Sequence, residues 1–156
     1  MPKHKQATPD VAAGPSPTQA EIEGLARKQG MRALLNLNVE GEPGQVLSPN
    51  VEATWAHTFY MQHERLSLDV HFLDAGYVTA FLVLLERIAK PVYVHSRQGR
   101  RAAALIGILL AEQQGLSGVE AVLAARSRGL DCGEELRPFV EAEVDRRRAR
   151  SGAQAS

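Results

Sequence analysis

The sequence lacks the features that mark several large classes of protein. Its only cysteine is Cys132, so no disulfide can form within the chain, and a reducing compartment is predicted. The formal net charge is zero, which excludes a global electrostatic attraction to nucleic acid or to a membrane surface. The most apolar windows are about 14 to 16 residues long and interrupted by charge, too short to span a bilayer. The first residues also lack the apolar run of a signal peptide, and we expect a cytoplasmic protein.

The length of 156 residues is sufficient for one domain with its own apolar core. We expect a mobile N-terminal segment over residues 1–10, a single domain over residues 11–150 and a disordered tail over residues 151–156. The sequence contains no internal repeat.

Helical and extended patterns alternate along the chain. Helical spacing of apolar residues, together with capping residues before some segments and glycine or proline after others, predicts helices at residues 19–28, 51–57, 73–89, 101–114, 119–128 and 134–150. Apolar runs predict strands at residues 31–37, within 59–68, and at 92–94. This alternation predicts an α/β fold, with a mostly parallel sheet of about four or five strands and helices on both faces. Ligand sites in such folds lie beyond the carboxyl ends of the strands.

One stretch of the sequence combines the features of an anion site. A buried strand (residues 92–94) stops at His95, a polar turn follows, and an apolar helix begins near Arg101. A strand that turns tightly into a helix directs backbone N–H groups at one point, at the positive end of the helix dipole. Gly99 allows backbone angles that a side chain would forbid, and three arginines add positive charge. The predicted phosphate-binding residues are Ser96, Arg97, Gln98, Gly99, Arg100 and Arg101.

The same stretch resembles the active-site loop of cysteine-dependent protein phosphatases. Its residues 95–101 read His-Ser-Arg-Gln-Gly-Arg-Arg, which is similar to the Cys-Arg-x-Gly-x-Arg frame of the bacterial dual-specificity-like branch, the beta-lactamase-hydrolase-like phosphatase domain. Weaker matches lie at residues 13–17, at 36–38 and in the Leu-Asp before the long helix. The resemblance covers most of the chain and implies a three-layer phosphatase-like fold.

The chain departs from that family at the nucleophile, where Ser96 occupies the position of the catalytic cysteine. The family's thiolate attacks phosphorus, whereas a hydroxyl stays protonated at neutral pH and is a poor nucleophile without a base. A serine-hydrolase elbow is excluded because Val94 and Gln98 stand where that motif needs glycine. We therefore expect an inactive or trapping protein, either a natural pseudophosphatase or the Cys-to-Ser form of an active phosphatase. An ordinary loop role for Ser96 stays open.

The resemblance assigns roles to other residues of the motif. Most tyrosine phosphatases carry the phosphate-clamping arginine six residues after the cysteine, where this chain has Ala102. The shorter bacterial frame places the clamp on Arg101, with Arg100 as the alternative. His95 is expected to support the loop by a hydrogen bond to its backbone, and to point away from Ser96 because neighbouring strand residues face opposite sides.

The general acid is harder to assign from the sequence. The family's place for it corresponds to Asp69, with Asp74 as the rival, although Asp74 is the better candidate for a helix cap. An ordinary loop role for Asp69 is also open. Cys132 is expected to lie far from the anion loop, so it is not predicted to act as a reserve nucleophile.

The predicted partner is a phosphorylated protein or a small phosphoester, with no nucleic acid, no membrane, no cofactor and no metal. His57, His63 and His71 show no paired metal-ligand spacing. Two alternative functions remain. One is a non-catalytic phosphate-binding module, and the other is a rhodanese-like sulfurtransferase relative, which the loop frame suggests but which needs a cysteine to carry the persulfide. The sequence does not predict the oligomeric state.

Overall fold

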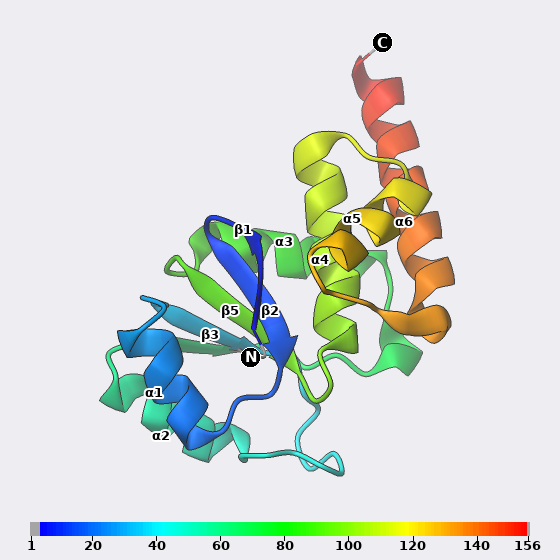
Figure 1. Cartoon of the computed structure of the whole chain (residues 1–156). Helices are drawn as coiled ribbons and strands as arrows, with labels where there is room; N and C mark the ends of the chain where they lie inside the picture. The colour runs from blue at the N-terminus through cyan, green and yellow to red at the C-terminus, as the bar shows by residue number, and fades with distance from the viewer. Residues whose placement is uncertain (1–3, 156) are drawn as a thin grey trace.

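The computed structural model describes residues 4–155. It contains a five-stranded sheet that is covered by helices on both faces (Figure 1). The strand order is β1-β2-β5-β3-β4, with β1 antiparallel to β2 and all other pairs parallel. The predicted fold class is confirmed. The strands are β1 (Lys5–Thr8), β2 (Val11–Pro15), β3 (Ala33–Asn36), β4 (Gln62–Arg65) and β5 (Val92–Ser96). The helices are α1 (Gln19–Arg27), α2 (Pro49–Thr58), the 3₁₀ turn η1 (Val70–Phe72), α3 (Ala75–Arg87), α4 (Arg100–Gln114), α5 (Gly118–Ser127) and α6 (Gly133–Ala155).

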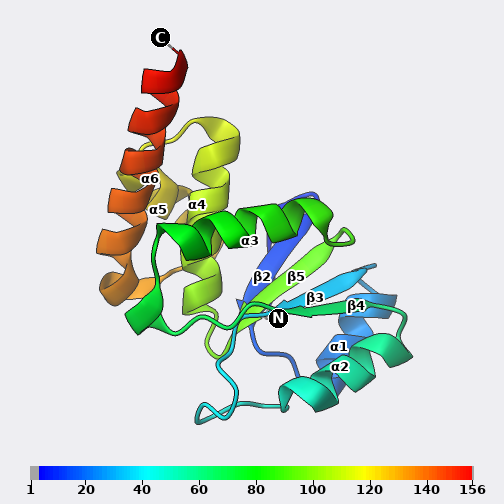
Figure 2. The ribbon, with the colours of Figure 1, turned by 180° about the vertical axis from the view of Figure 1, so that it is seen from behind.

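Side-chain alternation along the strands separates two apolar cores, one on each face of the sheet. Val92 and Val94 of the central strand β5 belong to the larger core, with α3, α4, α5 and α6. Tyr93 between them belongs to the smaller core, with α1 and α2. Figure 2 shows α3 and α4 on one side of the sheet, and α1 and α2 on the other. The strand that carries the predicted anion loop therefore lies between two packed layers.

The helix after β5 contains more buried residues than any other helix of the described residues. All ten residues 102–111 of α4 are buried, and α4 packs against α5 and α6 as well as against β2 and β5. No single helix among residues 4–155 is long and apolar enough to cross a membrane. The helices α4 and α5 meet that test only as a pair, with a 113° bend between them.

Local sequence signals mark the helix ends correctly. Ser117 and Glu120 form the capping box predicted for α5, and Asp74 caps α3 by accepting a hydrogen bond from the Tyr77 N–H at 2.8 Å. Each predicted helix is present; the largest difference is at the end of α6.

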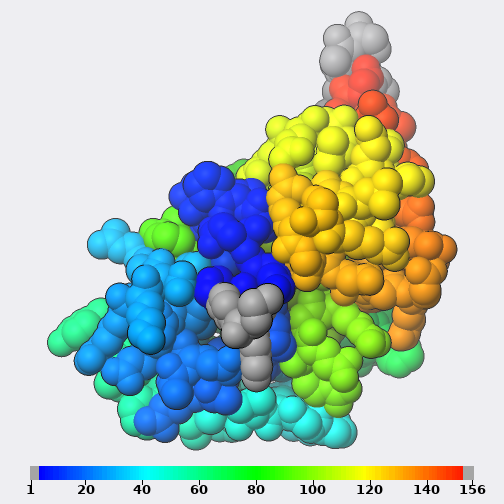
Figure 3. Space-filling model, in the orientation of Figure 1, coloured from blue at the N-terminus to red at the C-terminus, as the bar shows by residue number. Residues whose placement is uncertain are grey.

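The structure corrects the prediction of a mobile N-terminal segment. Residues 5–8 form β1, which pairs with β2. Neither strand was predicted from the sequence. Ala7 is buried, and its carbonyl accepts a hydrogen bond from Arg128 Nε at 2.9 Å, so the turn after α5 holds the hairpin in place. In Figure 3 the blue hairpin lies directly against the yellow helix α5. Residues 1–3 lie outside the described residues.

The other end of the chain differs from its prediction as well. The helix α6 continues through Ala155, where a disordered tail was predicted from residue 151. Residue 156 lies outside the described residues. The last turns of α6 extend beyond the helical layer in Figure 1.

Candidate functional site

The turn between β5 and α4 depends on one glycine. Gly99 has a φ of 86°, in the left-handed region, and an added Cβ would lie 3.0 Å from the carbonyl carbon of Gly14 and 3.2 Å from the nitrogen of Pro15. A side chain is thus excluded both by the backbone angle and by space. The helix begins without the side-chain cap found at α1, α2, α3 and α5. An anion can therefore satisfy N–H groups at the start of α4.

An open cavity of about 320 Å³ lies over this turn, and we call it the β5–α4 cavity. Its wall combines the turn with the loop after β3, with η1 and with the start of α6. Five of the six predicted phosphate-binding residues line it, and Gly99 is buried beneath them. The lining residues are Glu42, Val70, Ser96, Arg97, Gln98, Arg100, Arg101, Cys132, Gly133, Glu134, Glu135 and Leu136.

Arg101 is held at the cavity by a carboxylate that the sequence analysis did not single out. Its guanidinium donates to Glu42 Oε1 at 2.9 Å and to Glu42 Oε2 at 2.8 Å, and also to the Leu68 carbonyl at 3.0 Å. Burial raises the pKa of Glu42, but hydrogen bonds from Arg101 and from the Val39 N–H outweigh burial and lower this pKa below its usual value. A phosphate that binds Arg101 must share it with this carboxylate or displace it.

The other two arginines are held differently. Arg97 donates to the Pro43 carbonyl at 2.9 Å, so it contacts the same loop as Arg101. Arg100 is exposed and makes no ion pair within residues 4–155. Its aliphatic stem packs against the start of α6, because an added Cβ on Gly133 would lie 3.6 Å from Arg100 Cδ. The cavity thus contains one arginine that is paired, one that is held by a backbone carbonyl and one that is free for a ligand.

Ser96 has no base within reach. It is 1% exposed, and its Oγ accepts a hydrogen bond from the Ala102 N–H at 3.3 Å, its only side-chain hydrogen bond within the described part of the chain. The His95 ring lies on the opposite face, with Nε2 2.9 Å from Glu52 Oε2 and Nδ1 3.3 Å from Ser16 Oγ. The predicted hydrogen bond from His95 to the loop backbone is replaced by these two side-chain contacts.

His95 belongs to a buried cluster of ionisable groups. Glu52, on α2, is 1% exposed and also contacts His63 Nε2 at 2.7 Å. Burial raises the pKa of Glu52, but the charge of His95 and the hydrogen bonds from both histidines outweigh burial and lower this pKa to about 2. Glu52 is therefore ionised throughout the physiological range, and it fixes the orientation of His95.

The buried cluster continues to the cavity through two further side chains. Ser16 Oγ, which contacts His95, accepts a hydrogen bond from Asn38 Nδ2 at 2.7 Å. Asn38 Oδ1 in turn lies 3.4 Å from Arg101 Nη2. Residues on both faces of the sheet therefore position the arginine. The sequence predicted His95 as a support of the loop, but gave no signal that Glu52 and Asn38 take part.

Asp69 does not line the cavity, although its neighbour Val70 does. Its Oδ1 accepts a hydrogen bond from the His71 N–H at 2.9 Å and starts η1. The role of Asp69 as general acid stays a prediction.

Cys132 corrects the prediction that it lies far from the anion loop. It lines the β5–α4 cavity, because the turn between α5 and α6 returns to the start of α4. The thiol is 5% exposed, and burial, reinforced by the Asp131 charge, raises its pKa. It therefore stays protonated and lacks the thiolate character of a nucleophile.

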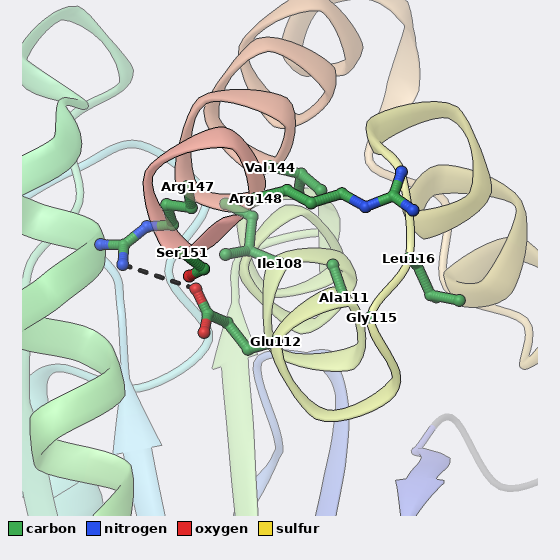
Figure 4. Close-up of a pocket in the computed structure, with 9 residues that line it drawn as sticks. All are labelled: Ile108, Ala111, Glu112, Gly115, Leu116, Val144, Arg147, Arg148 and Ser151. Atoms are coloured by element: carbon green, nitrogen blue, oxygen red, sulfur yellow. Dashed lines mark ion pairs between the residues drawn. The ribbon is translucent and has the colours of Figure 1, made fainter. Parts of the chain in front are cut away.

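A second pocket lies between α4 and α6, away from the anion turn (Figure 4). It measures about 150 Å³, and its floor is apolar, with Ile108 and Val144. Arg147 at its edge is 3.5 Å from Glu112 and is also paired with Glu143. This pocket contains none of the predicted site residues, and one of its two arginines, Arg147, is already neutralised.

Comparisons with known proteins were informative at the level of structure. No family model matches the chain, and no curated protein sequence matches it significantly. Among solved structures, a candidate phosphatase from Neisseria meningitidis superposes with a TM-score of 0.78 at 19% identity, over 92% of this chain and 99% of that one. The catalytic core of the PP-IP phosphatase Siw14 from S. cerevisiae gives 0.72 at 15% identity, over 96% and 93%.

A third similar structure is a candidate phosphatase from Shewanella putrefaciens, with a TM-score of 0.73 at 18% identity, over 93% of this chain and 92% of that one. Identities at this level show the fold and leave the activity open. In all three comparisons the superposition covers more than 90% of both chains. The chain has the dual-specificity-like protein tyrosine phosphatase fold.

Proposed function

We propose that the protein binds phosphate monoesters in the β5–α4 cavity and hydrolyses them slowly or not at all. The observation that carries this proposal is the composition of the cavity. Ser96 lies at its base, at the start of α4, where the N-cap residue Gly99 has no side chain, and three arginines line its wall. Four other pockets among the described residues lack this combination of a helix start with several cations.

Binding follows from the groups that surround the turn. The N–H groups of the turn and the first residues of α4 would receive phosphate oxygens, and the helix dipole favours a negative ligand at this end. Arg101 can grip two oxygens at once, because a guanidinium matches the geometry of phosphate as it now matches the Glu42 carboxylate. Arg100, which makes no ion pair within residues 4–155, supplies a second charge.

Hydrolysis would need groups that the cavity lacks. Attack by Ser96 must form an Oγ–P bond, break the bond to the leaving oxygen, and move the hydroxyl proton to a base. No imidazole or carboxylate within the described residues contacts Ser96 Oγ. A neutral hydroxyl also removes the negative charge that a thiolate would place against the phosphate, so a bound ester should persist.

The proposed ligand is a phosphorylated protein or a small phosphoester. A sulfurtransferase reaction gains no support, because Ser96 cannot carry a persulfide and the Cys132 thiol is buried with a raised pKa. In the proposed function, the protein therefore recognises a phosphate ester and retains it.

Turnover of p-nitrophenyl phosphate by the unaltered chain and by Ser96→Cys tests the proposal. We expect no turnover above buffer from the serine form and clear turnover from Ser96→Cys, because a thiolate at the start of α4 needs no base. Activity of Ser96→Cys should persist when Cys132→Ser is added, which separates the two thiols. Robust turnover by the serine form would refute the proposal of slow hydrolysis. Inactivity of every form would show that the cavity does not support hydrolysis even with a cysteine at position 96, and only the proposed binding of phosphate would remain.

A further inference from the structure

We infer that the β5–α4 cavity selects a phosphorylated peptide segment that carries a basic side chain beside the phosphorylated residue. This inference depends on the proposed binding of phosphate. It adds the class of ligand, which neither the fold nor the anion loop specifies.

One side of the cavity wall is acidic. The first turn of α6 contributes Glu134 and Glu135, and this turn adjoins the stem of Arg100. Glu134 is already neutralised by Arg126 at 3.3 Å and by Arg137 at 2.9 Å. Glu135 is exposed and has no ion pair within residues 4–155. An open carboxylate thus lies in the same cavity as the anion turn.

The charges of the cavity decide what can accompany the phosphate. Three arginines and three carboxylates line it, but Glu134 is neutralised by arginines outside the cavity, so the lining carries about one positive charge before a ligand enters. A phosphate dianion brings the cavity to about one negative charge, which a positive group on the ligand would offset. A second phosphate or an acidic neighbour would instead be repelled by Glu135. The cavity therefore disfavours polyphosphorylated small molecules and favours a ligand with lysine or arginine nearby.

The second feature is an exposed aromatic residue close in sequence to the cavity lining. Val70 lines the cavity, and Phe72, two residues further along η1, is 77% exposed. Because Phe72 is close in sequence to a lining residue, a ligand that extends beyond the anion turn can contact it, and aromatic residues are enriched at surfaces that bind partners. A peptide chain extends on both sides of its phosphorylated residue and can cover Phe72, whereas a small phosphoester lacks that extension.

Calorimetric titration of the unaltered chain with three phosphopeptides tests the inference. The peptides differ only in the residues beside the phosphorylated one, which are arginine, alanine or aspartate. Exposed ion pairs change affinity by about threefold for each unit charge, so we expect the basic peptide to bind about tenfold more tightly than the acidic one at low salt. Glu135→Gln should reduce this ratio to about threefold. Glu23→Gln, which removes a carboxylate on α1, should leave the ratio unchanged.

A second variant tests the contact with Phe72. Phe72→Ala should weaken all three peptides by a similar factor and leave the binding of inorganic phosphate unchanged. Equal affinity for the three peptides, or a charge preference that Glu135→Gln does not alter, would overturn the inference while leaving the proposed function intact. Failure of inorganic phosphate to bind would instead remove the proposed function itself.

Discussion

The two faces of β5 treat ionised side chains in opposite ways. On the face toward α1 and α2, the Glu52 carboxylate lies between two histidines and is 1% exposed. On the other face, Glu42 pairs with Arg101 at the edge of an open cavity, and both side chains are 15% exposed. The buried Glu52 has no access to a ligand that could replace its two histidine partners. Arg101, at an open cavity, can release Glu42 and bind a ligand instead. The buried cluster around Glu52 therefore stabilises the fold, and the partly exposed pair of Glu42 and Arg101 is available for ligand binding.

The largest expected effect is the loss of stability on removing the buried carboxylate. Glu52→Ala leaves His63 and His95 without their shared partner, so we expect the free energy of unfolding to fall by about 3 to 5 kcal/mol. Urea denaturation measures this change. The exposed Glu23→Ala, which breaks only a surface pair with Arg27, should cost less than about 0.5 kcal/mol. Equal effects of the two variants would erase the contrast between the faces.

The acid stability of the fold sharpens the same contrast. Because the pKa of Glu52 falls from 4.5 to about 2 on folding, its contribution is present above pH 4.5 and is lost as the pH falls toward 2. A shift of this size corresponds to about 3 kcal/mol. Unfolding free energies measured between pH 6 and pH 2 should decline in the unaltered chain and decline much less in Glu52→Gln. Parallel declines would show that other groups govern acid unfolding.

On the open face the largest effect should fall on ligand binding. Arg101→Ala removes a two-point contact, so affinity for inorganic phosphate should fall by about 10- to 150-fold, the equivalent of 1.5 to 3 kcal/mol. Arg100→Ala should cost less, because Arg100 is not directed by other side chains, and Arg87→Ala on α3 should cost nothing. Calorimetry measures all three. A larger loss in Arg100→Ala than in Arg101→Ala would transfer the clamp to Arg100.

The turn itself can be tested with two glycines that share a backbone angle. Gly99 and Gly115 both have positive φ, but only at Gly99 would an added Cβ meet backbone atoms, those of Gly14 and Pro15. Gly115→Ala should cost about 1 kcal/mol of stability from the backbone angle alone, and Gly99→Ala about 2 kcal/mol with weaker phosphate binding. Equal stabilities would show that the turn can relax.

The smallest expected effect concerns the carboxylate that occupies Arg101. Glu42→Gln removes both the competition for Arg101 and a negative charge beside the anion turn, so phosphate should bind about threefold to tenfold more tightly. A titration at low salt detects this. Weaker binding would instead mean that Glu42 keeps Arg101 in position for the ligand.

The fold and the anion turn were predictable because their signals are local. The strand, the turn with Gly99 and the apolar helix of residues 101–114 are continuous in sequence. The helices α1, α2, α3 and α5 begin with side-chain caps, and α4 ends at Gly115. The strand β2 was missed because its residues, Val-Ala-Ala-Gly-Pro, show neither alternation nor β-branched enrichment beyond Val11. Its position follows from pairing with β5, which is 81 residues away.

The partners of the site residues could not be predicted for the same reason. Glu42 lies in a glycine-rich loop that reads as a plain connection, yet it meets Arg101 across 59 positions. Cys132 reads as a turn residue, and only the return of the chain to the start of α4 brings it to the cavity. Glu134 and Glu135 match an ordinary acidic first turn of a helix, so their place in the cavity wall leaves no separate trace in the sequence.

The account depends most directly on whether the turn between β5 and α4 holds a doubly negative oxyanion. Titration of the unaltered chain with inorganic phosphate, followed by ³¹P NMR, measures this without any assumption about the natural ligand. The account predicts saturable binding at one site, competed by p-nitrophenyl phosphate and weakened in Arg101→Ala. Absence of saturable binding, or binding that survives Arg101→Ala and Arg100→Ala together, would contradict it.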